Sequence, residues 1–299
     1  MKCTINRRSQ FSASHRYWLP ELSAADNQRL FGLCARAPGH GHNYVLNVSI
    51  AGAVSEVSNA DSATGMVLNL STAKDIIQKE ITEPLNFSYL NDAWPEFQTT
   101  LPTTEYIAWV IWQKLSPHFC DSAHLVNVQL QETPELWADY QGNGMEAYLT
   151  VSSHFSAAHR LALPELSYEE NCKLYGKCAR PNGHGHNYHL EVTVKGDIHP
   201  RTGMIVDLVA LQNAINHHVM EPFDHTFLNK DIPYFMTVVP TAENIAARIC
   251  HLLVQPIADI GAALHKVKLI ESPNNYAEAF AADLDMETNT VSHSSLAVM

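Results

Sequence analysis

The chain of 299 residues contains an internal duplication, and this feature constrains its fold more than any other. The segment FSASHRYWLPELS, which begins at Phe11, recurs as FSAAHRLALPELS from Phe155. At the same spacing, CARAPGHGHNY from Cys34 recurs as CARPNGHGHNY from Cys178. Chance does not align so many segments in one order, so the sequence indicates two homologous units in tandem.

The boundary between the units follows from the spacing of the later motifs. The similarity continues to Glu132 in the first unit and to its counterpart Glu271 in the second. Between the units, residues 141–145 read QGNGM, a composition typical of a turn. We therefore expect a first unit at residues 1–141, a second unit at residues 145–280 and a polar tail at residues 281–299.

Hydrophobic periodicity predicts the same elements in each unit. Residues 184–195 alternate between two faces, which predicts a half-buried antiparallel strand. The segment 209–219 has helical spacing and is expected to stop before Pro222. A second helix is expected after Thr241, whose side chain can cap it. This order of elements predicts an α+β fold with helices covering one face of a sheet.

Charge and cysteine usage argue against several classes of protein. The formal net charge of −12 is unlike that of nucleic-acid or anionic-membrane binders, which need excess Lys and Arg. No stretch is apolar enough to span a membrane and no secretory signal begins the chain, so we expect a cytoplasmic protein. The six cysteines form no CxxC pair, which favours reduced thiols.

Three histidines recur in register in both units. In HGH the two imidazoles point to the same side of a strand and can bind one ion, and the FSAxH segment supplies a third. Three histidines and one open coordination position are typical of catalytic zinc. Zn²⁺ is favoured over iron because no carboxylate completes a facial triad within the motif. The predicted ligands are His15, His40 and His42 in the first unit and His159, His184 and His186 in the second.

Further candidate residues surround these ligands. Cys34 and Cys178 occupy the same loop before HGH, and Lys177 and Arg180 would favour the thiolate of the second cysteine. The adjacent Asp224 and His225 can form a proton relay, although they also fit an exposed polar pair at a helix end. Glu271, like Glu132, ends a strand, where it is either a clamp for an amidine-like edge of a heterocycle or an ordinary charged terminus.

The motifs FSAAH, PNGHGHNY, TGMIVDL, EPFDHTFLN, PTAENIA and IESPNN together resemble the 6-pyruvoyl-tetrahydropterin synthase family, from about residue 155 to residue 276. The resemblance implies the tunnelling fold (T-fold), in which each unit offers a four-stranded antiparallel sheet and two helices, and several units close a barrel. It implies that 7,8-dihydroneopterin triphosphate is converted to 6-pyruvoyl-tetrahydropterin with release of triphosphate. It also implies that His159, His184 and His186 hold zinc, Cys178 is the general base, Asp224 and His225 form the relay, and Glu271 anchors the pterin.

The first unit departs from the family pattern at the relay, where it reads Asn86 and Phe87. Phenylalanine cannot transfer a proton, so our hypothesis is that each chain has two metal half-sites but only one relay. At most one complete site then forms per chain, and the sequence does not decide whether Cys34 or Cys178 belongs to it. Because the family assembles its sites between units, we expect a homo-oligomer, with a homotrimer mimicking a hexamer of single units.

Three other interpretations compete with this one. A sister subfamily makes 6-carboxy-tetrahydropterin in the queuosine pathway, but the spacing from Cys178 to HGH and the Asn-Asn after Glu271 favour the pyruvoyl branch. The lost relay of the first unit also suits a non-catalytic zinc- or pterin-binding protein. An unrelated zinc hydrolase is disfavoured because the chain has no HExxH motif.

Overall fold

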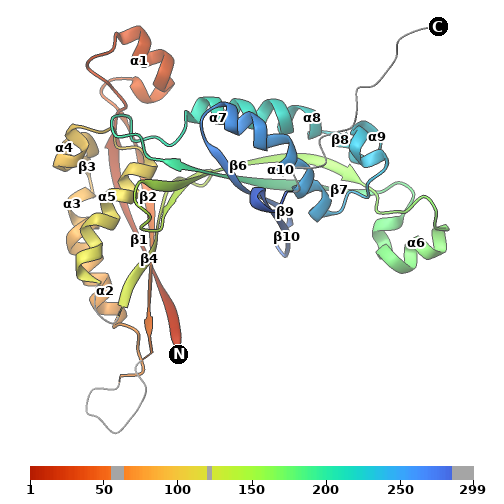
Figure 1. The fold of residues 1–299 in the computed structure, drawn as a ribbon, viewed down its shortest axis with the longest axis horizontal. Coiled ribbons are helices and arrows are strands. Elements are labelled where there is room, and N and C mark those ends of the chain that lie inside the picture. Colours follow the sequence, from red (N-terminus) through yellow and green to blue (C-terminus); the bar gives the residue numbers. More distant parts are fainter. Residues whose placement is uncertain (55–63, 120–122, 285–299) are drawn as a thin grey trace.

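The computed structural model describes residues 1–54, 64–119 and 123–284, and in them both units share one continuous sheet (Figure 1). Ten strands belong to this sheet within the described residues; its main path runs β10-β9-β7-β6-β5-β4-β2-β1-β3, and β8 pairs with β6. The strands of the first unit are β1 (Lys2–His15), β2 (His40–Ala53), β3 (Ser88–Tyr89), β4 (Ala123–Thr133) and β5 (Leu136–Tyr140). Those of the second unit are β6 (Glu146–His159), β7 (His184–Asp197), β8 (Thr226–Phe227), β9 (Ala263–Ser272) and β10 (Asn275–Phe280).

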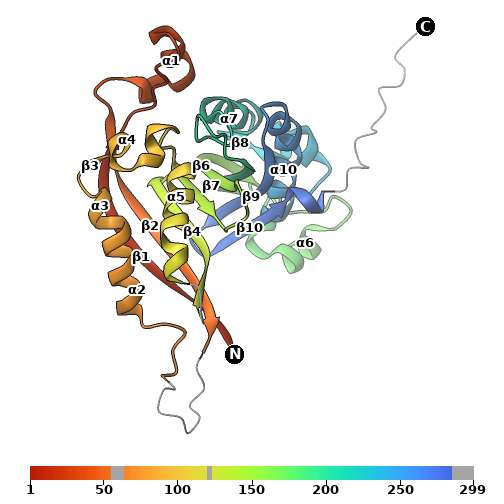
Figure 2. The same ribbon diagram turned by 60° about the vertical axis from the view of Figure 1, so that its left-hand side comes forward.

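The longer helices lie on one face of this sheet, with α2 and α5 on the first unit and α7 and α10 on the second (Figure 2). The helices of the first unit are α1 (Ala24–Phe31), α2 (Leu70–Ile77), α3 (Glu83–Leu85), α4 (Leu90–Ala93) and α5 (Thr104–Leu115). Those of the second unit are α6 (Tyr168–Tyr175), α7 (Leu208–Ile215), α8 (Glu221–Phe223), α9 (Leu228–Asp231) and α10 (Ala242–Asp259). The expected α+β class, with four antiparallel strands in each unit, is confirmed.

The alternation expected for residues 184–195 is present in β7. Tyr188, Leu190 and Val192 are fully buried against the helices, whereas the side chains between them face the opposite side of the sheet. Full burial of one such aliphatic side chain stabilises the fold by about 1.5–3 kcal/mol. The core that results is continuous from the first unit into the second.

The helix after β7 runs further than expected. α7, a π-helical turn (Asn216–Met220) and α8 follow one another directly, so the helical segment includes Pro222 instead of stopping before it. Pro222 stands in the first turn of α8, directly after the wide π turn. The first unit has the same insertion at Gln78–Thr82, so the departure from a simple helix is a property of both repeats.

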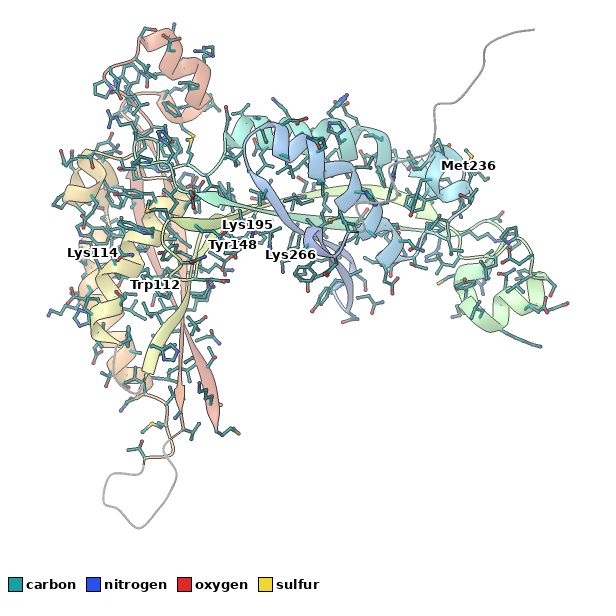
Figure 3. All side chains as sticks on the ribbon, in the orientation of Figure 1. Trp112, Lys114, Tyr148, Lys195, Met236 and Lys266 are labelled. Carbon is teal, nitrogen blue, oxygen red and sulfur yellow. The ribbon has the colours of Figure 1, made fainter. Side chains whose placement is uncertain are left out.

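The expected boundary between the units, residues 141–145, is a tight turn that joins β5 directly to β6. Gly142 has φ +82°, and a side chain at this position would collide with the indole of Trp112 on α5, which Figure 3 labels. The indole N–H of Trp109 donates to the carbonyl of Gly144 over 3.2 Å. Because β5 and β6 also pair with each other, from Leu136 opposite Val151 to Asp139 opposite Tyr148, the two units form one sheet.

A second contact between the units comes from residues 198–206, between β7 and α7, which we call the docking loop. Arg201 makes two hydrogen bonds to the carboxylate of Glu21, at 2.7 and 2.6 Å. The N–H of Ile205 donates to Glu105 Oε1 over 3.3 Å, and burial raises the pKa of this carboxyl to about 7. Met204 packs against an apolar cluster of the first unit, formed by Tyr17, Leu19, Phe31, Ala35 and Leu101. We refer to strand pair β5–β6 and this loop together as the internal seam.

Two further expectations concern membrane-spanning segments and the C-terminal tail. In the described part of the chain, no helix combines the length and the apolar character needed to cross a bilayer. Of the expected tail, residues 281–283 form a short 3₁₀ helix, and residues 285–299 lie outside the described residues.

Candidate active site

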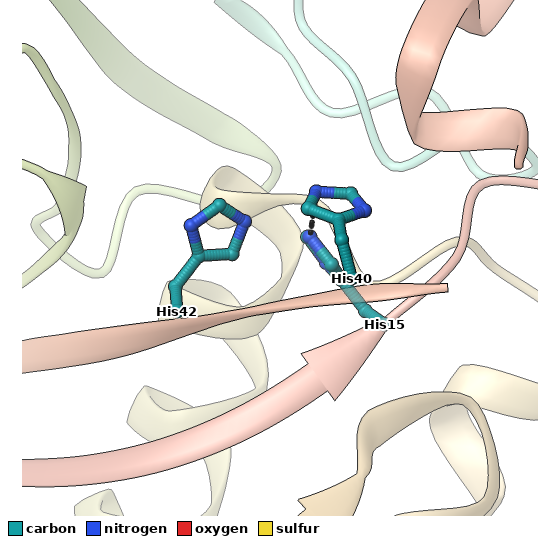
Figure 4. A group of neighbouring side chains, drawn as sticks. All are labelled: His15, His40 and His42. Atoms are coloured by element: carbon teal, nitrogen blue, oxygen red, sulfur yellow. Dashed lines mark hydrogen bonds between the residues drawn. The ribbon is translucent and has the colours of Figure 1, made fainter. Parts of the chain in front are cut away.

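The sheet register brings three histidines together at one end of each unit. His15 at the end of β1 lies opposite His40 at the start of β2, and His42 follows on the same face (Figure 4). The second unit repeats this arrangement, with His159 on β6 opposite His184 on β7. We call the set His15, His40 and His42 the first centre and the set His159, His184 and His186 the second centre. Within each centre the ligand atoms of the three histidines all lie within 4.8 Å of one another.

Backbone carbonyls orient the most buried histidine of each centre. His15 Nδ1 lies 3.1 Å from the carbonyl oxygen of Pro102, and its Nε2 lies 3.2 Å from His40 Nε2. A proton on Nδ1 donates to this carbonyl, which leaves the lone pair of Nε2 directed at the other imidazoles. His159 has the same contact with the carbonyl of Pro240, at 2.7 Å. The tautomer required of a metal ligand is therefore fixed by the fold.

Burial favours the neutral form of the most buried histidine in each centre. Burial lowers the pKa of His15 to about 3 and that of His159 to about 4, while the hydrogen bond to the proline carbonyl acts in the opposite direction. Within the described residues, the buried Nε2 atoms of His42 and His186 make no hydrogen bond. Converging ring nitrogens that lack a hydrogen bond are suitable donors for a metal ion.

A carboxylate lies at the rim of each centre. Glu132 Oε1 is 3.3 Å from His42 Nε2, and Glu271 Oε1 is 3.4 Å from His186 Nε2. The sequence favoured zinc because the HGH motif itself contains no carboxylate. In the fold, a carboxylate from a neighbouring strand lies beside each centre. Glu132 is also held by the hydroxyl of Thr104, which donates to its Oε2 over 2.6 Å.

The cysteine loops are attached next to the centres. The carbonyl of Cys34 accepts a hydrogen bond from the N–H of Tyr17 over 2.9 Å, and that of Cys178 accepts one from Leu161 over 3.0 Å. Tyr17 and Leu161 each lie two residues beyond a histidine of a centre. Burial and, to a smaller extent, the charge of Glu132 raise the pKa of the Cys34 thiol. A bound divalent cation would act in the opposite direction and favour the thiolate.

Asp224 and His225 lie at the edge of β6, on the side that faces the first unit. Asp224 Oδ1 accepts from the N–H of Ser156 over 2.8 Å, and the N–H of His225 donates to the carbonyl of Ser156 over 2.6 Å. His225 Nδ1 is 2.9 Å from Asp224 Oδ2, and 83% of the histidine side chain is exposed. The bond from Ser156 and the bond with His225 lower the pKa of Asp224. An ionised carboxylate thus orients an imidazole whose other nitrogen is accessible.

At the same position, the first unit keeps these hydrogen bonds but has no side chain that can transfer a proton. Asn86 Oδ1 accepts from the N–H of Ser12 over 3.0 Å, and the N–H of Phe87 donates to the carbonyl of Ser12 over 2.6 Å. Phe87 and His225 share φ +58°, a left-handed conformation that is costly for residues other than glycine. Phe87 is 87% exposed. The strained turn is therefore maintained by its hydrogen bonds, with or without a residue that can carry a proton.

Sequence reasoning missed several groups that shape the centres. The carbonyls of Pro102 and Pro240 orient the buried histidines, and the hydroxyl of Thr104 holds Glu132. The available signal was the recurrence of Pro-Thr before the last helix of each unit, which indicated only a helix start. The contact between that segment and the first strand connects residues far apart in the chain, so only the fold reveals it.

Comparison with known proteins gives consistent matches. The family model described as 6-pyruvoyl tetrahydropterin synthase matches residues 4–143 and again residues 148–282. A Pongo abelii protein named 6-pyruvoyl tetrahydrobiopterin synthase is 48% identical over 134 residues, which cover 45% of this chain and 91% of the relative. A Rickettsia bellii 6-carboxy-5,6,7,8-tetrahydropterin synthase is 26% identical over 140 residues, covering 42% of this chain and 93% of the relative. The solved Caenorhabditis elegans 6-pyruvoyl tetrahydropterin synthase aligns with a TM-score of 0.44 and 36% identity, covering 46% of this chain and 96% of that structure.

Proposed function

Since the chain belongs to the 6-pyruvoyl tetrahydropterin synthase family and is an enzyme of its lyase type, we propose that it converts 7,8-dihydroneopterin triphosphate to 6-pyruvoyl-tetrahydropterin and releases triphosphate. The observation that carries this proposal is the buried three-histidine centre with a carboxylate at its rim. Such a centre can hold the hydroxyl-bearing side chain of the substrate near the metal while the carboxylate binds its ring.

The proposed metal is Zn²⁺, held by the three histidines of a centre. Three neutral imidazoles and an open position match the donor set of catalytic zinc. Bound zinc would act as a Lewis acid that makes the protons beside the substrate hydroxyls easier to remove.

The proposed roles of the side chains follow from their chemistry. Glu132 or Glu271 accepts two N–H donors from the amidine-like edge of the pterin and so fixes the ring. A cysteine of the adjacent loop, Cys34 or Cys178, removes a proton from the substrate side chain as its thiolate. His225, oriented by Asp224, accepts or donates the second proton through Nε2.

The pyruvoyl product is favoured over the carboxy product by similarity. Identity is 48% to the Pongo abelii relative and 26% to the Rickettsia bellii relative, over almost the same length. The alternative of a non-catalytic binding protein is disfavoured because the Asp224 and His225 pair retains the hydrogen bonds that orient it.

The test is to incubate the zinc-loaded chain with 7,8-dihydroneopterin triphosphate, to identify the pterin by mass and to measure released triphosphate. A 6-pyruvoyl product with triphosphate is the expected result. Formation of 6-carboxy-tetrahydropterin with acetaldehyde would assign the chain to the other branch. No turnover by protein with both centres loaded would overturn the proposal in favour of a binding protein.

A further inference from the structure

Two exposed histidines lie opposite each other on the face of the second unit's sheet that the long helices leave uncovered. His154 on β6 pairs with His189 on β7 in the antiparallel register. Their neighbours Phe155 and Tyr188 are buried against the helices, so the two histidines belong to the other face of their strands. The ring centroids of His154 and His189 are 6.1 Å apart, and the ring planes are inclined by 43°. Two imidazoles thus lie side by side away from the core.

This pair is separate from the second centre. His189 follows His186 by three residues, so the alternation of β7 directs the two side chains to opposite faces of the sheet. Three residues of strand also separate their Cα atoms by about 10 Å. On β6, His154 and His159 are likewise an odd number of residues apart. The pair therefore does not share an ion with the second centre.

The spacing of the pair is close to that of histidines which converge on one point. Within the two centres the ring centroids are 4.5–5.1 Å apart. The distance of 6.1 Å between His154 and His189 is only slightly larger. Both side chains are exposed, so rotation about their χ angles is free to close this difference and to direct one nitrogen of each ring at a single ion.

Both rings are available as ligands. In the described part of the chain, neither His154 nor His189 makes a hydrogen bond or an ion pair through its side chain. The backbone beneath them is firmly held, because β6 and β7 pair along their whole lengths without a bulge. A backbone that already places both imidazoles on one face lowers the entropic cost of binding an ion between them.

The charged groups near the pair do not oppose a cation. Glu191 follows His189 by two residues on the same face, and its Oε2 lies 3.3 Å from Lys268 Nζ. The same ammonium group lies 4.9 Å from the ring centre of Tyr276. The positive charge of Lys268 is therefore compensated by a carboxylate and directed at an aromatic ring.

The first unit has no such pair at the corresponding position. The offset that carries Phe11 onto Phe155 carries Gln10 onto His154 and Val45 onto His189. Gln10 and Val45 lie opposite each other in the register of β1 and β2, as the two histidines do in the second unit. Valine has no atom that can ligate a metal ion, so the first unit provides an internal reference with the same strand pairing.

We propose that His154 and His189 form a binding site for one divalent transition-metal ion, with Cu²⁺ preferred to Zn²⁺. The affinity of nitrogen ligands rises along the divalent metals to Cu²⁺, and two imidazoles completed by water suit its tetragonal geometry. Zinc sites in proteins have three or four protein ligands, so the pair holds Zn²⁺ more weakly than the three-histidine centres do. The site does not depend on the proposed function.

A second contact between histidine rings outside the centres supplies the matched control. The ring centroids of His217 and His218 are 4.8 Å apart. These are consecutive residues of the π-helical turn, and consecutive side chains on a helix do not face each other. His217 Nδ1 also lies 3.4 Å from Glu221 Oε2. We therefore expect this second pair not to chelate an ion.

The first experiment is a calorimetric titration of the full chain with Cu²⁺ in excess Zn²⁺, followed by elemental analysis of both metals. Two linked ligands exceed a single one by about 10²- to 10⁴-fold in affinity. We therefore expect His154→Gln and His189→Gln each to bind about one Cu²⁺ ion fewer per chain in the tight phase, with affinity about 100-fold weaker at that site. Copper that enters the centres would be counted equally in every variant.

The control His218→Gln should bind copper as the wild type does. The same copper affinity in the wild type, His154→Gln and His189→Gln would overturn the proposal. Loss of copper from His218→Gln, with none from the other two variants, would also overturn it and assign the ion to the helical pair.

Electron paramagnetic resonance identifies the ligands directly. The tightly bound Cu²⁺ ion should show coupling to two imidazole nitrogens in the wild type, and this signal should be absent from His189→Gln at the same copper concentration. A signal that His189→Gln leaves unchanged would contradict the assignment.

Transfer of the pair to the first unit tests whether the strand register suffices. In the His154→Gln background, Gln10→His and Val45→His together place two histidines opposite each other on β1 and β2. Tight copper binding and the two-nitrogen signal should return. A variant with the circular dichroism of the wild type that regains neither would show that opposed positions on these strands do not form the site.

Discussion

At the scale of single residues, the two centres have the same three histidines and different surroundings. Each has a buried histidine held by a proline carbonyl and a carboxylate within 3.4 Å of another histidine. The first centre adds the hydroxyl of Thr104 and the cover of the docking loop. Zinc binding and catalysis are therefore expected to separate, with two zinc sites per chain and one site that turns over substrate.

Substitution of a single ligand tests the independence of the two metal sites. His42→Ala and His186→Ala each remove one of three nitrogens, which weakens zinc at that centre and leaves the other intact. Elemental analysis after gel filtration should give about two zinc ions per wild-type chain and about one in each variant. Two ions retained in either variant would show that the substituted histidine is not a ligand.

Glu105 makes the stability of the chain depend on pH. Its pKa is about 7 in the folded protein, against an ordinary value of 4.5, because burial disfavours the charge. Between these values the folded state holds a proton that the unfolded state releases, so the free energy of unfolding falls as pH rises. Above about pH 7 this contribution is constant.

The matched variant is Glu105→Gln, which keeps an oxygen for the N–H of Ile205 and cannot ionise. Urea unfolding should show a smaller loss of stability between about pH 5 and 7 in the variant than in the wild type. The same loss in both proteins would mean that another group causes the pH dependence.

At the scale of elements, the turn at residues 141–145 is a connection that tolerates little change. Gly142→Ala would combine a left-handed φ of +82° with a collision against Trp112. Gly261→Ala is the control, because its φ is +86° and no atom lies near the added carbon. We expect the control to cost about 1 kcal/mol and Gly142→Ala to cost about 2–3 kcal/mol more, measured by denaturant unfolding. Equal costs would show that Trp112 moves aside.

The sequence predicted the elements whose signal is local. Alternation identified β7, and the i, i+2 spacing of HGH placed two imidazoles on one face of it. The helix end before Pro222 was wrong, because a π turn precedes the proline and single-residue propensities do not indicate such a turn. The roles assigned to Cys178, Asp224 and the other site residues stay predictions.

Contacts between segments that lie far apart in the chain could not be predicted from the sequence. The docking loop carries the Thr-Gly-Met motif, whose recurrence was visible, but nothing in the motif indicates that Met204 packs against Leu101. Likewise, Glu132 reaches His42 only through the pairing of β2 with β4. The side of β6 on which Asp224 lies depends on the order of strands, and this order decides which centre the relay faces.

At the scale of the whole molecule, the histidine centres and the internal seam lie in different parts of the sheet. The histidines lie at the ends of β1, β2, β6 and β7, while the seam pairs residues 136–139 with residues 148–151. Removal of zinc by a chelator should therefore lower the melting temperature, because a ligand that binds only the folded state stabilises it. The mass of the assembly should not change. A chelated protein that dissociates would show that the metal supports the docking of copies.

The turn between β5 and β6 has a consequence for symmetry. Because it holds the two units side by side in one sheet, first and second units must alternate around any closed ring of this sheet. Such a ring contains only whole chains, so its number of units is even, and rings of three units are not available. The expected homotrimer stays a prediction, and it requires a single ring of six units. In an alternating ring every second junction is chemically equivalent. Under the hypothesis of one relay per chain, the loss in the first unit would therefore affect every other junction and never all of them.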